Sequence, residues 1–421
     1  MEERRIRNSL AVSTPARGGR IVALDVVRGL CLSEMMVDHV PHNIVWQFLT
    51  GAPGFFSAAE GFVFLSGFVG CWTATRALNR GHSMNSIFRR FHSRNLMLYR
   101  MYLLLLTMVL WFAVRGGPQF DIWRQFCDVR AGAVQVWLRG AMLLHLPDYL
   151  DIFAMYVVFL TAMPVLFNQV RLGRIKTVLL VSLIIWGIAQ VWDPSWSGYL
   201  LYKAGYFNVL AWQFLYTLGA VLGYKAANGK ITHRPRFYSF IVCLVLATLF
   251  FLTRHVGIAQ YIGLRLPVLD SSSLAYKPKL GVLRVLNFLV VAYCVWYVML
   301  RFGQRLSRKY AYRQFALLGQ HSLQVFSWSV AVTYISFLSG RTWIHIRPSV
   351  QLLIVALVVM SLWIPAHLHA RWSKWVRESR NTRSICELPP QVVEIRCYSL
   401  SSLRRVSGDG SRVTPQAHGN R

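Results

Sequence analysis

The feature that most constrains this chain is a series of apolar runs, each about 20 residues long. A helix of that length spans the hydrocarbon core of a bilayer, roughly 30 Å thick, whereas soluble proteins spread apolar residues over amphipathic elements. Hydrophobic residues make up 55% of the chain and charged residues only 15%. The sequence therefore predicts an all-α, polytopic integral membrane protein.

The apolar runs predict ten membrane spans. We place them at residues 21–41, 55–75, 95–114, 149–168, 175–192, 205–224, 237–256, 281–300, 314–338 and 349–369. The stretch 131–147 stays outside this set because Arg139, His145 and Pro147 interrupt it. The first run carries internal charges and no A-x-A-like cleavage site, so we expect it to remain as a helix.

Lys and Arg concentrate on one side of the predicted membrane. The two tails and the loops on their side hold 32 of these residues, and the opposite loops hold 11. Basic loops favour the cytoplasmic side, so both termini are predicted to be cytoplasmic. This asymmetry accounts for most of the net charge of +30. The basic loops would face the lipid bilayer, and no nucleic-acid-binding motif accompanies them, so we expect no nucleic-acid partner.

The composition predicts three regions. Residues 1–20 form a basic cytoplasmic tail, residues 21–370 the membrane domain, and residues 371–421 a second basic tail that is rich in Ser, Arg, Gly and Pro and is expected to be disordered. The seven cysteines include no CxxC pair and show no spacing typical of a metal site, so no metal is expected.

Charged residues interrupt the first apolar run, LDVVRGLCLSEMMVDHV. An ionised group at the centre of a span costs roughly 2.5 to 3.5 kcal/mol on insertion scales, so such residues need a reason. Arg28 and His39 differ by only about 20° in direction and lie about 16 Å apart along a helix. Asp25 lies on the same stripe, close enough to pair with Arg28, and Glu34 and Asp38 point elsewhere. This stripe is expected to face the protein interior, for chemistry or for packing.

The first run, followed by SAAEGFVFLSGFVG, resembles the opening of the OpgC family, bacterial inner-membrane proteins implicated in succinylating osmoregulated periplasmic glucans. Four later stretches resemble the same family: LDIFAMYVVFL from Leu150, FNVLAWQFLYTLG from Phe207, LGVLRVLNFLVVAY from Leu280 and LGQHSLQVFS from Leu318. The resemblance covers most of residues 20–370. It implies an O-acyltransferase of the bacterial inner membrane that acts on a periplasmic glycan, with acyl-CoA, expected to be succinyl-CoA, as the donor.

The spacing of Arg28 and His39 and the FLSGF of the second run are also similar to a wider superfamily of transmembrane acyltransferases that modify surface sugars. There the histidine is the proposed catalytic residue, and a basic motif at the third span is proposed to help with the acyl donor. Arg90 and Arg94 are the nearest match, with three intervening residues instead of two. The positive-inside bias of a cytoplasmic loop explains these arginines equally well.

Within this resemblance each polar residue has an expected role. A neutral imidazole, with a reference pKa of about 6.5, suits His39 as the general base. Glu60 or Asp38 could orient that imidazole, although Glu60 could instead pair with Arg28. Arg28 could bind an anion, such as a phosphate of coenzyme A or an acyl carboxylate.

Three further residues are candidates for substrate binding. Ser66 could donate a hydrogen bond to substrate or could bond to a carbonyl of its own helix. His321 and Asp151 lie in family-like stretches, where a structural role is the alternative. A transporter or exporter with a charged helix along its permeation path is the rival function, although we find no paired broken helices of the kind that mark many transporters.

Overall fold

The computed structural model describes residues 21–41, 43–45, 54–129, 132–192, 205–230, 235–255, 274–338 and 347–386. This part of the chain is helical, with connecting turns and without any β-strand. The chain divides into two compact units, residues 1–366 and 367–421, which are described separately. The site discussed below lies entirely in the first unit.

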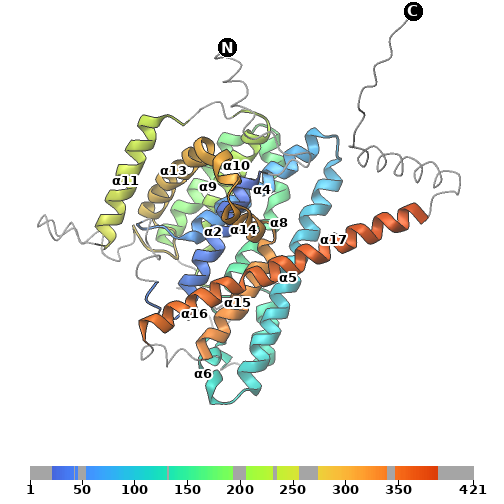
Figure 1. Cartoon of the computed structure of the whole chain (residues 1–421), viewed down its shortest axis with the longest axis vertical. Coiled ribbons are helices and arrows are strands. Elements are labelled where there is room, and N and C mark those ends of the chain that lie inside the picture. The colour runs from blue at the N-terminus through green and yellow to red at the C-terminus, as the bar shows by residue number, and fades with distance from the viewer. Residues whose placement is uncertain are drawn as a thin grey trace, which may run out of the picture. The chain divides into compact units, whose positions relative to one another are not determined.

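Figure 1 colours the helices along the chain, from blue near the N-terminus to red near the C-terminus. The first half contains α2 (Val22–His39), α4 (Ala58–Asn79), α5 (Met84–Arg115), η2 (Pro118–Phe120), α6 (Asp121–Cys127), α7 (Ala133–Ala141), α8 (Asp151–Arg171) and α9 (Ile175–Val191). The second half contains α10 (Val209–Ala227), α11 (Phe237–His255), α13 (Val282–Ser307), α14 (Tyr310–Gln320), α15 (Ser322–Leu338), α16 (Pro348–Ser361) and α17 (Trp363–Cys386).

Six stretches of the described helices are long and apolar enough to cross a membrane. They are Ala58–Asn79, Met84–Arg115, Asp151–Arg171, Phe237–Arg254, Val282–Ser307 and Pro348–Val376. Each overlaps one of the ten predicted spans, and the shorter apolar helices α9 and α15 overlap two more. The polytopic, helical class is therefore supported, whereas the total of ten and the cytoplasmic location of both termini remain predictions.

The predicted span at 314–338 is divided in the structure. α14 ends at Gln320 and α15 begins at Ser322, with His321 between them. α14 packs along α2 so closely that a Cβ on Gly319 would lie 1.8 Å from the carbonyl oxygen of Asp25. This contact holds α14 against α2, whereas α15 begins as a separate helix after His321.

α4 and α10 pack against each other along most of their lengths. A Cβ on Gly67 would lie 2.0 Å from the carbonyl oxygen of Tyr216, and one on Gly219 would lie 2.1 Å from that of Phe64. Small residues at helix interfaces allow such close approach in membrane proteins. The glycines therefore fix the position of α10 relative to α4, and with it the position of Tyr216.

Several helix ends meet where α2 finishes. Asn43 donates from Nδ2 to the carbonyls of Val37 and Val40, at 3.0 and 2.6 Å, and thereby terminates α2. The backbone amide of Ala58, at the start of α4, donates to Oε1 of Glu34 at 3.1 Å.

α11 lies beside α13, at the left of Figure 1.

The helix α17 continues beyond the predicted membrane domain. It runs to Cys386, so residues 371–386 are helical although the sequence assigns them to the tail, and the rest of that tail lies outside the described residues. Within the second unit, Trp372 and Trp375 are exposed, and Lys374 pairs with Glu378 at 3.8 Å.

Candidate functional site

A pocket lies inside the bundle where six helices converge. It has a volume of about 60 Å³ and draws side chains from α2, α4, α5, α8, α10 and α15. Its lining consists of Arg28, Phe62, Ser66, Arg94, Leu98, Tyr156, Leu160, Tyr216, Ser322, Leu323 and Phe326. We refer to it as the Arg28 pocket. Two guanidinium groups and four hydroxyl groups contribute to a wall that is otherwise apolar.

Arg28 is the buried cation of this pocket. Its side chain donates from Nη2 to Oγ of Ser322 at 2.6 Å, and its guanidinium carbon lies 5.5 Å from the ring centroid of Phe62. The aromatic face and the hydroxyl offset part of the cost of placing a charge inside an apolar bundle. Asp25, expected to pair with Arg28, is also buried, lies near Tyr312, and packs its backbone against Gly319.

The two arginines of the proposed donor motif lie in different places. Arg94 lines the Arg28 pocket although its residue is exposed overall, so the pocket reaches from the bundle surface to buried Arg28. Arg90 is exposed on α5 and is not part of the pocket lining. Ser66 lines the pocket as well, and its hydroxyl donates to the carbonyl of Phe62 at 2.8 Å. The bond to a carbonyl of its own helix is therefore present, and a hydrogen bond from Ser66 to substrate stays a prediction.

His39 is the last residue of α2 and lies against Tyr149, with ring centroids 5.2 Å apart in an edge-to-face arrangement. Its Nδ1 atom is buried and has no hydrogen-bond partner among the described residues. Tyr149 has a backbone φ of 66°, a left-handed conformation that is unusual for a bulky residue. The imidazole therefore retains a nitrogen that could accept a proton.

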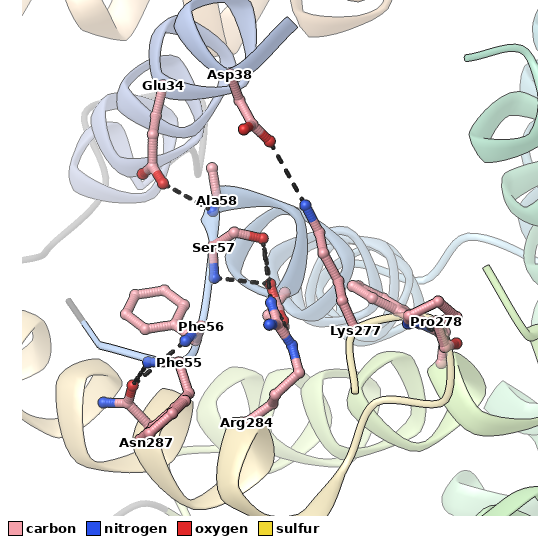
Figure 2. A network of polar contacts seen from close by, with 12 residues as sticks. Glu34, Asp38, Phe55, Phe56, Ser57, Ala58, Lys277, Pro278, Arg284 and Asn287 are labelled. Carbon is pink, nitrogen blue, oxygen red and sulfur yellow. Dashed lines mark hydrogen bonds and ion pairs between the residues drawn. The ribbon is translucent and has the colours of Figure 1, made fainter. Parts of the chain in front are cut away.

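Charged and polar side chains at the ends of α2, α4 and α13 form what we call the helix-end network, most of which Figure 2 labels: Glu34, Asp38, Ser57, Glu60, Lys277, Arg284 and Asn287. Asp38 pairs with Lys277 at 3.5 Å. Oδ1 of Asn287 accepts from the backbone amides of Phe55 and Phe56, at 2.6 and 3.3 Å. These contacts join α2, α4 and α13 through their ends.

Glu60 has partners different from those expected for it. One carboxylate oxygen accepts from the backbone amide and hydroxyl of Ser57, at 3.0 and 2.8 Å, which completes a capping box at the start of α4. The other oxygen accepts from Nε of Arg284 at 2.7 Å. Glu60 thus bonds to neither His39 nor Arg28, and it closes a helix end instead.

Asp151 and His321 also make backbone contacts. The carboxylate of Asp151 accepts from the amides of Ile152 and Tyr206, at 2.9 and 2.7 Å, so it connects the start of α8 to the segment before α10. The backbone amide of His321 donates to the carbonyls of Leu317 and Leu318, both at 3.2 Å. Asp151 lies outside the Arg28 pocket, whereas His321 directly precedes the pocket residue Ser322.

Arg28 and His39 have separate surroundings in this structure. Both lie on α2, but His39 is not part of the lining of the Arg28 pocket. The common helix face predicts that both side chains open into one solvated cleft, and the enzyme interpretation of the sequence depended on this; the Arg28 pocket does not include His39. The structure instead forms two polar regions along one helix, about 16 Å apart by helical rise.

Sequence reasoning overlooked Tyr156, Tyr216 and Ser322 in the pocket, and Arg284 in the helix-end network. A signal was available, since all four lie inside stretches that resemble the OpgC family. Arg284 is also a charged residue inside a predicted span, which is the signal that drew attention to Arg28. Within the described part of the chain, no three His, Cys, Asp or Glu side chains group as ligands for a metal.

Comparison with known families decides what kind of protein contains this site. The model of the OpgC protein family matches residues 20–375. The chain belongs to the OpgC family. Membership indicates a glucan-modifying function of the acyltransferase type in a membrane protein. No curated protein and no solved structure matches the chain significantly.

Proposed function

We propose that this OpgC-family protein is an O-acyltransferase of the bacterial inner membrane. In this proposal it moves a succinyl group from cytoplasmic succinyl-CoA to hydroxyl groups of a periplasmic glucan. The family match is the observation that carries the proposal, because it covers both polar regions of α2. The buried guanidinium of Arg28 and the unpartnered Nδ1 of His39 give that match a chemical basis.

His39 is the general base in this proposal. Its imidazole accepts the proton of a sugar hydroxyl while the hydroxyl oxygen attacks the thioester carbonyl carbon. The new C–O ester bond forms, the C–S bond breaks, and the departing thiolate takes the proton from the imidazolium. Lys277 and Asp38 lie beside the imidazole, where their charges act on the reacting groups.

In this proposal, the two polar regions of α2 bind different ends of the acyl donor. A succinyl chain of four carbons extends only about 5 Å, so its carboxylate cannot reach Arg28 while its thioester is at His39. The helical rise between Arg28 and His39 is about 16 Å, so a longer part of the donor molecule must span this distance. We therefore assign the phosphate end of the donor to Arg28 and Arg94, and the thioester end to His39.

Mass spectrometry of periplasmic glucans tests the proposal. Cells that lack this protein should lose the succinyl substituents, and wild-type chain supplied in trans should restore them. His39→Ala should leave acylation at least about 100-fold lower, because general-base catalysis contributes about that much. His82→Ala is the matched control, since His82 is exposed in the turn between α4 and α5.

Two results would contradict the proposal in different ways. Unchanged glucan acylation in the deletion strain would exclude this reaction and favour transport. Full activity of a folded His39→Ala variant would leave the reaction in place but remove the assignment of the base.

A further inference from the structure

The hydroxyls of Tyr216 and Tyr156, two residues that line the Arg28 pocket, have no hydrogen-bond partner among the described residues, unlike those of several other tyrosines of the bundle. Tyr216 is 2% exposed, lines the Arg28 pocket, and its hydroxyl oxygen has no hydrogen-bond partner among the described residues. Tyr99, Tyr102 and Tyr334 instead donate to backbone carbonyls at 2.7, 2.8 and 2.6 Å. A buried hydroxyl without a partner costs free energy, so a retained one calls for an explanation.

The position of Tyr216 prevents its hydroxyl from moving to a partner elsewhere. Its backbone carbonyl lies directly against Gly67 of α4, as described above, and its ring packs on Phe159 with centroids 4.9 Å apart. These contacts hold both ends of the residue. The backbone and the ring of this pocket-lining residue are therefore held in place.

The groups around the pocket define the chemistry of a ligand. Arg94 lies close enough to Tyr216 to interact electrostatically with its phenol, and Arg28 does the same with Tyr156, whose hydroxyl lies beside Ser66. Guanidinium and hydroxyl groups together favour an oxyanion, since each supplies hydrogen-bond donors to charged oxygen atoms. A volume of about 60 Å³ accommodates a group of a few heavy atoms, but not a whole donor molecule.

We propose that Tyr216 is a positioning residue that donates a hydrogen bond to a phosphate group of the acyl donor, held between Arg28 and Arg94 in this pocket. The inference rests on the proposed function for the identity of the donor. The ligand class, an oxyanion, follows from the pocket itself. A carboxylate would satisfy the same groups, so the experiment compares the two anions.

Isothermal titration calorimetry on the purified full-length protein tests this proposal with coenzyme A, inorganic phosphate and succinate as probes. Coenzyme A and phosphate should bind in competition, and succinate should not displace them. Tyr216→Phe should weaken the binding of both about tenfold, as expected for the loss of a hydrogen bond to a charged group. The KM for the acyl donor should rise while kcat stays unchanged.

Tyr224→Phe is the matched control because it lies two turns later on α10, outside the pocket lining. It should bind all three probes as wild type does. The melting temperature of Tyr216→Phe should equal or exceed that of wild type, since no hydrogen bond of the folded protein is lost.

Unchanged affinity in Tyr216→Phe, or a lower melting temperature with unchanged affinity, would overturn the proposal and make the hydroxyl structural. Displacement by succinate but not by phosphate would overturn the phosphate assignment. Binding does not depend on acyl transfer, so failure of the proposed reaction appears in the glucan spectra and not in the calorimetry.

Discussion

The helix-end network and the Arg28 pocket differ in how their polar side chains are bonded: the carboxylates of the network are paired, although Nδ2 of Asn287 there has no hydrogen-bond partner among the described residues. In the network, the carboxylates of Glu34, Asp38 and Glu60 accept from a backbone amide, from Lys277 and from Arg284, respectively. In the pocket, two guanidinium groups surround a small cavity and the hydroxyl of Tyr216 has no partner among the described residues. His39 lies beside the network, but its Nδ1 atom, like the hydroxyl of Tyr216, has no hydrogen-bond partner among the described residues.

This difference distinguishes structure from function within a membrane bundle. A polar group whose hydrogen bonds are complete stabilises the packing of helices and has no capacity left for a ligand. A buried polar group with an open hydrogen-bonding position lowers stability and calls for an explanation, of which a ligand is one. The comparison thus predicts large stability effects in the network and large binding or rate effects in the pocket and at His39.

The largest stability effect is expected for Glu60→Gln. The substitution leaves the buried guanidinium of Arg284 without its carboxylate, and removing one partner of a buried ion pair costs about 3 to 5 kcal/mol. Thermal unfolding of the purified protein measures the change. Glu378→Gln, in the exposed pair with Lys374, should change the melting temperature little. Equal changes in melting temperature for the two variants would contradict a dominant structural role of the buried pair.

Gly67→Ala should have the next largest effect. The new Cβ would lie 2.0 Å from the carbonyl oxygen of Tyr216, and overpacking of this kind typically costs about 1 to 3 kcal/mol. Gly187→Ala, in α9, is the control because nothing lies within 4 Å of its Cβ position. The control should keep or slightly raise stability, since Ala favours a helix more than Gly does. A stable Gly67→Ala variant would show that α4 and α10 can separate freely.

Asn287→Leu should destabilise the protein by about 1 to 3 kcal/mol. The backbone amides of Phe55 and Phe56 lose the side-chain oxygen that accepts from them, as Figure 2 shows. Unfolding in denaturant measures the difference. Asn79→Leu removes an exposed contact with Asn228 and should cost less than about 0.5 kcal/mol. The reverse order would mean that these amides find another acceptor.

The smallest stability effect is expected for Lys277→Met. Its pair with Asp38 has an N–O distance of 3.5 Å, and the two side chains are 24% and 19% exposed. A pair that water reaches contributes less than about 1 kcal/mol. If unfolding experiments gave a loss as large as that of Glu60→Gln, the ranking inside the network would be wrong. A changed rate without changed stability would instead connect Lys277 to the chemistry at His39.

Part of the site could be predicted from sequence because a charge in an apolar run is conspicuous. Arg28 and Arg94 were expected to bind the acyl donor and Ser66 was a candidate for substrate binding, and the structure gathers all three in one pocket. Arg90 was expected with them and lies outside the lining, because it is one helical turn before Arg94 on the exposed part of α5. Tyrosines resemble ordinary core residues in a sequence, so Tyr216 was not expected.

The sequence by itself determined that the chain forms apolar helices, that α2 carries a polar stripe, and that the protein resembles the OpgC family. Hydrophobic runs and helical period are local properties, so they can be read without a structure. Only the tertiary structure decided which groups meet. Glu60 binds Arg284 across 224 positions of sequence, and Arg28 binds Ser322 across 294. A helical period indicates the face on which a side chain lies, but packing between distant helices selects its partner.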